Sequence, residues 1–439
     1  MTHRLLASTI ALLLGTSLIT SHVIAQSEAI ETPPPSQVAA GSAVVVLARY
    51  GQSVRGTVDG FPLLVLRGTH AQRGEAHGAL TAKQIIAVCG STADFLLKSS
   101  YAANRQDNPW EKGIEAIARF TYPQRFEQEL AGMLRGIQTA LPDPADRVIP
   151  SLGRQITLED LKLLQTGEVF ELMRCSQFSA WGALTDDGQP IVGRNWDYPP
   201  LYSMDYACIV AIEPAEPGLS PTFDAMCFGM ISSGMATINR DGVYASANDG
   251  GISEQGVVIE QPEPVGLLLR TVMETAAPDQ VVDRFVEAID GHVTLGLLFQ
   301  FVGTDIEDGP AAIVEYDPQP DGQGTQVRHV QSRLPYALLM TNHCVAGDEK
   351  GPDESVGRYR TISDAINRHG RDRSKIRFDE VRQITNSVAK ASAVNTTMYT
   401  AVAWPAQRKM MVATAPDLAT PATQGRYVMV EWDQIFAAR

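Results

Sequence analysis

The pattern of apolar and polar positions divides the chain into a helical first part and a strand-rich second part. Residues 79–98 and 110–140 carry apolar side chains three or four positions apart, which is typical of amphipathic helices. The sequence Leu141-Pro142-Asp143-Pro144 should end the second helix, and Thr157 is expected to cap a short helix through Asp160. With two early strands at 43–47 and 61–66 and a loop over 68–78 that leads into the first helix, the part before residue 175 is expected to be mainly helical.

After residue 175, short strand-like runs alternate with glycine, asparagine and aspartate. These runs are 206–213, 225–231, 235–239, 242–248, 297–302, 312–316, 325–329, 336–341, 395–403, 410–413 and 427–432. Helical patterns occupy 264–289, 357–369 and 378–387. Strands grouped around helical pairs predict two antiparallel sheets with helices outside them. The sequence contains no internal repeat and no second compositional boundary.

A predicted β-hairpin lies near the middle of the chain. Its first strand starts at Cys175 and runs to about Leu184, Asp186-Asp187-Gly188 forms the turn, and 190–198 returns. The Cys175 thiol then faces Arg194 and Asp197. Ideal alternation places those two side chains on opposite faces of one strand, so both reach the thiol only with a bulge or a strand end near Trp196.

Composition and charge exclude some functions. The 439 residues are 44% hydrophobic and 20% charged, which is ordinary for a globular protein, and the net charge is −14. An acidic chain argues against nucleic acid and against a polyanionic membrane surface as partners. Neither number identifies a substrate.

The first 25 residues have the features of a secretory signal. Arg4 precedes an apolar run over 5–19, which is too short to span a bilayer, and Val23-Ile24-Ala25 is a small-residue cleavage site. Residues 26–42 are expected to be a flexible leader. No later segment is expected to span a membrane, so the sequence predicts a periplasmic or secreted protein.

Most of the usual catalytic and metal-binding patterns are missing from the sequence. No G-x-S-x-G, H-E-x-x-H or P-loop pattern is present, and the five cysteines fit no disulfide or zinc framework. A bridge between Cys208 and Cys227 is possible in an oxidising compartment. His70 and His77 are seven residues apart without a convergent carboxylate, so packing and capping roles are expected for them. No cofactor and no metal is therefore predicted.

Cys175 is the candidate nucleophile. A thiol needs a base, and an α-amine with a pKa of about 8 is suitable, but Cys175 has one only if the Arg174–Cys175 bond is cut. Arg194 would then favour the thiolate, and Asp197 would hold the new ammonium or orient the amine. An acyl-transfer intermediate also needs donors for its oxyanion, and two asparagines end strand-like runs. They are Asn248 and Asn342, and Arg358 follows soon after them.

These residues and the motifs around them resemble the N-terminal-nucleophile (Ntn) hydrolases, and most closely the acyl-coenzyme A:6-aminopenicillanic-acid acyltransferases. Choloylglycine hydrolases, penicillin V acylases and acid ceramidases are more distantly similar. Five segments carry the resemblance, which spans residue 61 to the C-terminus. They are the G-R-N-x-D-Y strand at 193–198, the N-x-x-G segment at 239–242 that leads to Asn248, the T-N…S-x-x-R pattern at 341–358, the glycine signature at 68–78 and the E-L-x-G-x-x-x-G helix at 129–136.

The resemblance implies an α+β fold, a four-layer αββα sandwich with two antiparallel sheets. Residues 43–174 would form a mainly helical segment and 175–439 the Ntn-hydrolase segment of the same fold, and the two would stay associated after a self-catalysed cut before Cys175. Cys175 would attack a linear, non-peptide amide and form a thioester. The small-molecule partner would be an acyl amide or an acyl donor. By family role, Arg194 and Asp197 would tune the amine and thiol, Asn248 and Asn342 would support the oxyanion, and Arg358 would be a structural or site cation.

Several alternatives stay open from the sequence alone. Cys175 could be a buried core cysteine of an uncleaved, non-catalytic binding protein on the same scaffold, or the substrate could be a lipid amide. Arg174 stands where relatives often have a small residue, so an external trypsin-like protease could also cut there. Arg360 competes with Arg358 for the cationic position.

Overall fold

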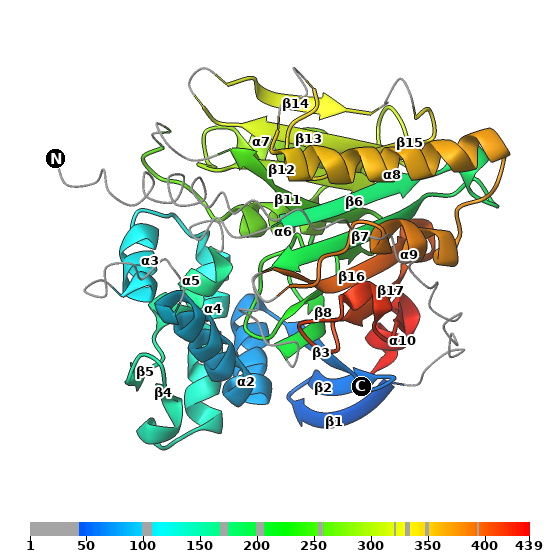
Figure 1. Ribbon diagram of the computed structural model, residues 1–439. Helices are drawn as coiled ribbons and strands as arrows, with labels where there is room; N and C mark the ends of the chain where they lie inside the picture. The colour runs from blue at the N-terminus through cyan, green and yellow to red at the C-terminus, as the bar shows by residue number, and fades with distance from the viewer. Residues whose placement is uncertain are drawn as a thin grey trace.

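The computed structural model describes residues 44–98, 108–166, 174–198, 206–252, 257, 259–319, 322–329, 334–346, 351–392 and 395–439 (Figure 1). The predicted signal sequence, 1–25, and the predicted leader, 26–42, lie outside the described residues. The described part of the chain is mixed α and β with two large sheets, as expected from the sequence.

The larger sheet has ten strands in the order β1-β2-β3-β8-β9-β10-β11-β12-β13-β14. Their bounds are β1 Val44–Tyr50, β2 Ser53–Val58, β3 Phe61–Gly68, β8 Ala207–Pro214, β9 Thr222–Cys227, β10 Thr237–Asn239, β11 Tyr244–Ile252, β12 Gly296–Val302, β13 Ala311–Asp317 and β14 Gly324–Arg328. Every neighbouring pair is antiparallel except β3 and β8, which are parallel. The prediction of purely antiparallel sheets was wrong at this pair, because β3 and β8 are joined through the helices and the hairpin between them, and not through a tight turn.

The smaller sheet has six strands in the order β15-β6-β7-β16-β17-β18, and all neighbours are antiparallel. Their bounds are β6 Arg174–Ala180, β7 Ile191–Tyr198, β15 Ala337–Met340, β16 Thr396–Trp404, β17 Lys409–Thr414 and β18 Val428–Glu431. The predicted hairpin is thus β6 and β7. Its first strand ends at Ala180 rather than near Leu184, because Gly182 takes a positive φ of 58° and starts a 3₁₀ turn.

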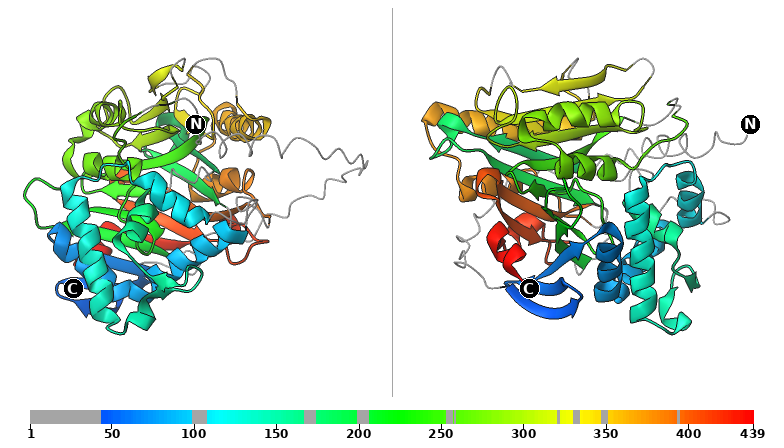
Figure 2. Two further views of the ribbon diagram at one scale, coloured as in Figure 1. Left: turned by 90° about the vertical axis from the view of Figure 1, so that its left-hand side faces the viewer. Right: turned by 180° about the vertical axis from the view of Figure 1, so that it is seen from behind.

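Helices cover an outer face of each sheet. Helices α6 (Val265–Thr275) and α7 (Val281–Ile289) share one apolar cluster with β11, β12 and β13 of the larger sheet. Helices α8 (Asp353–Asp372) and α9 (Phe378–Asn386) share another with the smaller sheet. The first pair lies toward the viewer in the rear view of Figure 2, and the second pair lies in front in Figure 1. A third apolar cluster contains Cys175 and side chains from both sheets.

Most of the remaining helices gather at one side of the molecule (Figure 1). They are α2 (His70–Lys98), α3 (Pro109–Ile117), α4 (Gln124–Ala140) and α5 (Leu158–Gln165), with the short pair β4 (Val148–Ile149) and β5 (Arg154–Gln155) beside them; α10 (Trp432–Ala437) ends the chain. Thr157 and Asp160 form the predicted capping box. The helix predicted over 110–140 is two helices, because Pro123 removes a backbone donor and disfavours helical geometry at the residue before it.

Helix α2 begins at His70, so the prediction of a loop over 68–78 was wrong. The glycines of this stretch face α4: a Cβ on Gly74 would lie 1.8 Å from the Glu129 carbonyl oxygen, and one on Gly136 would lie 2.0 Å from the Glu75 oxygen. The glycine signature and the E-L-x-G-x-x-x-G helix are therefore the two sides of one close helix–helix contact. By length and composition alone α2 is also long and apolar enough to cross a membrane, but 56% of its apolar window is buried inside the protein, as in a core helix.

Buried charges join these helices to the strand-rich part. Glu129 of α4 is fully buried, and its carboxylate lies 3.0 Å from Arg270 of α6 and 3.7 Å from Arg73 of α2. Arg73 also pairs with Glu216, which follows β8, at 2.9 Å, and the Nδ1 atom of His70 lies 2.6 Å from the same carboxyl group. His77 accepts a hydrogen bond from the Gly229 backbone. Both histidines therefore have the packing role expected for them.

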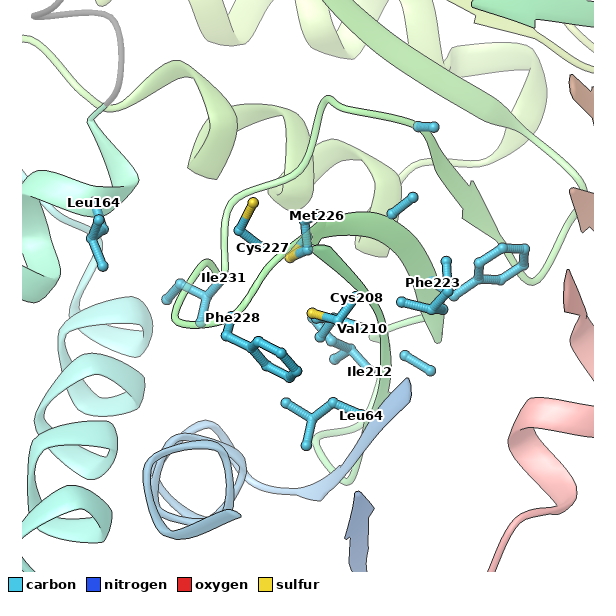
Figure 3. Close-up of a cluster of buried hydrophobic side chains, with 14 of the residues drawn as sticks. Leu64, Leu164, Cys208, Val210, Ile212, Phe223, Met226, Cys227, Phe228 and Ile231 are labelled. Carbon is cyan, nitrogen blue, oxygen red and sulfur yellow. The ribbon is translucent and has the colours of Figure 1, made fainter. Parts of the chain in front are cut away.

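The pair Cys208 and Cys227 lies in the apolar core (Figure 3). Cys208 pairs with Met226 across β8 and β9, and Cys227 pairs with Ala207, so the two cysteines stand on opposite faces of the sheet. Both thiols are free and buried. The possible bridge between them is not formed, and this register does not favour it.

Candidate active site

The β6–β7 register places the candidate residues around Cys175. Cys175 is opposite Trp196, Gln177 is opposite Arg194, and Arg174 is opposite Asp197. Arg194 therefore shares a face with Cys175, and Asp197 belongs to the other face. The bulge expected near Trp196 is absent from this pair of strands; the irregularity lies on the far side of β7, where the pairing with β16 shifts between Thr397 and Tyr399.

Arg194 reaches the thiol diagonally across the hairpin. Its Nη2 atom lies 3.7 Å from Cys175 Sγ and donates to the Ala247 carbonyl at 2.7 Å. Its Nη1 atom donates to Gln177 Oε1 at 2.7 Å and to Asn248 Oδ1 at 3.0 Å. Three acceptors thus fix the guanidinium against the sulfur, in a site where both side chains are buried.

The Cys175 thiol is protonated at neutral pH in the uncut chain. Burial raises its pKa to about 11, and the Arg194 cation opposes that shift without cancelling it. The Asp197 charge adds to the rise, while a hydrogen bond from the Asp197 backbone lowers it. A base is needed to make this sulfur a nucleophile.

Asn342 and Arg358 hold the backbone of Cys175 on both sides. The Cys175 N–H donates to Asn342 Oδ1 at 2.9 Å. Arg358 donates from Nη2 to the same Oδ1 at 2.7 Å and from Nη1 to the Cys175 carbonyl oxygen. Arg360 is exposed, so Arg358 is the cation that the structure brings to this place. Glu354, one turn earlier on α8, accepts from Arg358 Nε at 2.6 Å.

Asp197 lies beside this anchor and not against the sulfur. Its Oδ1 accepts from Thr397 Oγ1 at 2.6 Å, and its Oδ2 has no hydrogen-bond partner in the described part of the chain. Arg358 Nη1 is 3.9 Å from that oxygen. Burial raises the pKa of Asp197 to about 6, although Arg358 and Thr397 act in the opposite direction. The side chain is a buried carboxyl group with one oxygen open to a further donor.

Each of the two asparagines donates one side-chain hydrogen bond to a backbone carbonyl in the uncut chain. Asn248 Nδ2 donates to the Thr341 carbonyl at 2.9 Å, and Asn342 Nδ2 donates to the Asp249 carbonyl at 2.7 Å. The Asn248 side-chain oxygen accepts from Arg194, and the Asn342 side-chain oxygen accepts from the Cys175 N–H. Each Nδ2 has a second N–H, so either amide could support an oxyanion and keep its present acceptor.

Three residues at the site have no role in the sequence-based prediction. Gln177 positions Arg194, Thr397 binds Asp197, and Asp249 binds Arg174 at 2.7 Å. Strand alternation places Gln177 on the face of Cys175 and so offers a signal for it. Thr397 comes from a strand 200 residues further along the chain, and no local pattern identifies it.

The arrangement joins a thiol, a guanidinium and a backbone held at both its nitrogen and its carbonyl in one buried place. Breaking the bond before Cys175 would turn that nitrogen into an amine next to its own thiol, with the Asn342 oxygen in place to accept a hydrogen bond from it. In the described residues, no group of three or more histidine, cysteine or acidic side chains is arranged to hold a metal ion.

Comparison with known proteins gives the following similarities. Residues 183–417 match the family model of acyl-coenzyme A:6-aminopenicillanic acid acyl-transferase. No curated protein matches the chain. Among solved structures, two variants of the conjugated bile acid hydrolase from Clostridium perfringens are 13% identical, with TM-scores of 0.41 and 0.40; each covers 59% of this chain, with 93% and 98% of their own chains covered. Penicillin V acylase from Agrobacterium tumefaciens is 14% identical, with a TM-score of 0.37, and 59% of this chain and 86% of that chain are covered.

The family match extends over more than half of the chain. It begins eight residues after Cys175 and contains Arg194, Asp197, Asn248, Asn342 and Arg358. It confirms the resemblance drawn from the sequence motifs. This chain belongs to the acyl-coenzyme A:6-aminopenicillanic acid acyl-transferase family.

Proposed function

We propose that this protein is an exported, self-processing cysteine amidohydrolase or acyltransferase that acts on a linear, non-peptide amide through a thioester on Cys175. The proposal rests on two hydrogen bonds to the Cys175 backbone, one at its nitrogen and one at its carbonyl, next to a thiol that contacts Arg194. Asn342 and Arg358 hold the nitrogen and the carbonyl of one residue, which is how an N-terminal nucleophile would be fixed once its upstream peptide bond is gone.

In the first reaction, the Cys175 sulfur attacks the Arg174 carbonyl carbon. The S–C bond forms, the C–N bond breaks, and the thiol proton passes to the nitrogen of Cys175. Water then hydrolyses the thioester, which leaves a carboxylate on Arg174 and frees the thiol. Arg194, at 3.7 Å, favours negative charge on the sulfur as the bond forms.

Later turnovers repeat the same steps on a substrate amide. The freed α-amine takes the thiol proton and delivers it to the leaving amine, and the acyl group passes from sulfur to water or to an acceptor amine. The Asn342 oxygen that accepts from the Cys175 N–H in the uncut chain would still accept a hydrogen bond from this amine.

The assignment of fold and segments follows from the same proposal. The apolar contacts of α6 and α7 with the larger sheet and of α8 and α9 with the smaller sheet support a four-layer αββα sandwich as the proposed arrangement. Residues 26–174 and 175–439 would be the two processed chains of one fold, secreted or periplasmic after removal of the first 25 residues. The buried charges between α2, α4 and α6 would keep the chains together.

A non-catalytic binding protein is the alternative, and one observation favours it. The Cys175 thiol is fully buried, and a pKa of about 11 leaves only a small fraction of it as the reactive thiolate at neutral pH in the uncut chain. The enzyme hypothesis requires the chain to be cut before Cys175, and the binding-protein hypothesis requires it to stay whole. A lipid-amide hydrolase would be the same enzyme with another acyl group in its substrate.

The test is the intact mass of purified protein together with two variants. Wild-type protein should split between Arg174 and Cys175, and Cys175→Ala should stay whole. Arg174→Gln removes the recognition residue of a trypsin-like protease and should still be cut by its own thiol. A Cys175→Ala protein that splits would show that an outside protease acts, and a wild-type chain that stays whole would favour the binding-protein reading.

A further inference from the structure

The residue before the proposed cut is held by a buried carboxylate. Arg174 Nη1 donates to Asp249 Oδ2 at 2.7 Å. The Asp249 side chain is 7% exposed and that of Arg174 is 40% exposed, so the guanidinium enters from the surface and the carboxylate receives it from the interior.

The strand end that carries Asp249 is built tightly against the candidate oxyanion residue. The pairing of β11 with β12 shifts between Asp249 and Ile252, and Gly251 takes a positive φ of 70° there. Asp249 Oδ1 accepts the Gly251 N–H at 2.7 Å, and the Asp249 carbonyl accepts Asn342 Nδ2 at 2.7 Å. A Cβ at Gly251 would lie 2.8 Å from the Asn342 carbonyl oxygen. The carboxylate is thus fixed by the same backbone segment that engages the Asn342 amide.

Chemistry links this carboxylate to the acyl group of the substrate. In the proposed self-cleavage the acyl group on sulfur is the one that ends in Arg174, and in each later turnover the substrate's acyl group forms its bond to the same sulfur atom. The side chain of Arg174 therefore marks the space that a substituent on the acyl carbon chain enters. Cleavage frees the Arg174 end of the chain, and a substrate can then compete for Asp249.

We infer that Asp249 is a cation-binding subsite that selects amides whose acyl group carries a guanidinium or ammonium at about the reach of an arginine side chain. This inference rests on the proposed function and names its substrate class. A buried carboxylate without a cation is unfavourable, because its lost hydration is not replaced, so a cationic acyl group gains from pairing with it. The net charge of −14 also attracts cationic substrates to the protein.

The experiment compares two arylamides that differ only in charge, Nα-benzoyl-arginine 4-nitroanilide and Nα-benzoyl-citrulline 4-nitroanilide. The processed wild type should hydrolyse the arginine compound with the higher kcat/KM, and Asp249→Asn should reduce that preference roughly tenfold to a hundredfold, because a hydrogen-bonded buried charge pair is lost. The kcat/KM for the citrulline compound should change by less than about threefold in Asp249→Asn. Asp241→Asn is the matched control, since Asp241 pairs with Arg240 on the exposed surface near the start of β11.

A Cys175→Ala preparation measures hydrolysis by contaminating trypsin-like proteases, which is subtracted. A set of neutral acyl amides is assayed beside the pair. If the wild type hydrolyses neutral amides but shows no preference for the arginine compound, or if Asp249→Asn lowers both rates equally, the inference is wrong and the proposed function stands. If the wild type hydrolyses none of these amides above the Cys175→Ala background, the proposed function is wrong and the inference falls with it.

Discussion

Replacing Asp197 by asparagine in the uncut Cys175→Ala protein should make folding stability less sensitive to pH. In the uncut chain Asp197 is buried, with Thr397 on one oxygen and no hydrogen-bond partner for the other in the described residues. Burial raises its pKa from 3.8 to about 6, and Arg358, 3.9 Å away, only partly offsets that. The asparagine keeps the acceptor for Thr397 and does not titrate.

The size and the sign of the effect follow from the two pKa values. Between pH 3.8 and about 6, the folded chain still holds a proton that the unfolded chain has released, so rising pH favours unfolding. A shift of about two pKa units corresponds to about 3 kcal/mol. The free energy of unfolding of the asparagine variant, minus that of the aspartate protein, should therefore rise by about 3 kcal/mol from about pH 3.5 to about pH 7.5 and then stay constant.

The assay is urea unfolding followed by tryptophan fluorescence, with both proteins measured at each pH. Other titrating groups are common to the two proteins and cancel in the difference. A difference that does not change with pH would refute the reasoning, because it would mean that the attraction of Arg358 equals the effect of burial. In the cut wild-type protein the new ammonium of Cys175 should supply the missing partner, and this loss of stability with rising pH should disappear.

Three further predictions concern stability and processing. Glu129→Gln removes the buried carboxylate that Arg73 and Arg270 share, although each arginine keeps a second carboxylate, Glu216 and Glu274 respectively. It should lower the free energy of unfolding by about 3 kcal/mol, measured by urea unfolding. Gly74→Ala should cost about 3 kcal/mol or more, because its Cβ would overlap the α4 backbone, while Gly370→Ala, which meets nothing within 4 Å, should be neutral or stabilising in the same assay. Arg358→Lys cannot hold two acceptors with a planar fork and should slow self-cleavage at least about tenfold by intact mass, whereas the exposed Arg360→Lys should not.

Local patterns in the sequence predict the hairpin, the capping box at Thr157 and most strands of both sheets, because each depends on residues a few positions apart. The start of α2 is different. Gly68 to Gly78 looks like a loop by propensity, and only the close approach of α4 explains why a helix forms there. The contact between Thr397 and Asp197 and the parallel pairing of β3 with β8 join distant parts of the chain, so periodicity gives no sign of them.

The residues around Cys175 also come from distant parts of the chain, so periodicity does not show that they meet. The family match begins after Cys175, yet three side chains that hydrogen-bond to the thiol or to its backbone come from inside the matched region. They are Arg194 through the hairpin register, Asn342 just after β15, and Arg358 from α8. A cysteine shifted by one position on β6 would point to the other face and lose the contact with Arg194. The pairing of β6 with β7 and β15 therefore fixes the unmatched strand in register against matched residues, and Cys175 lies in contact with them.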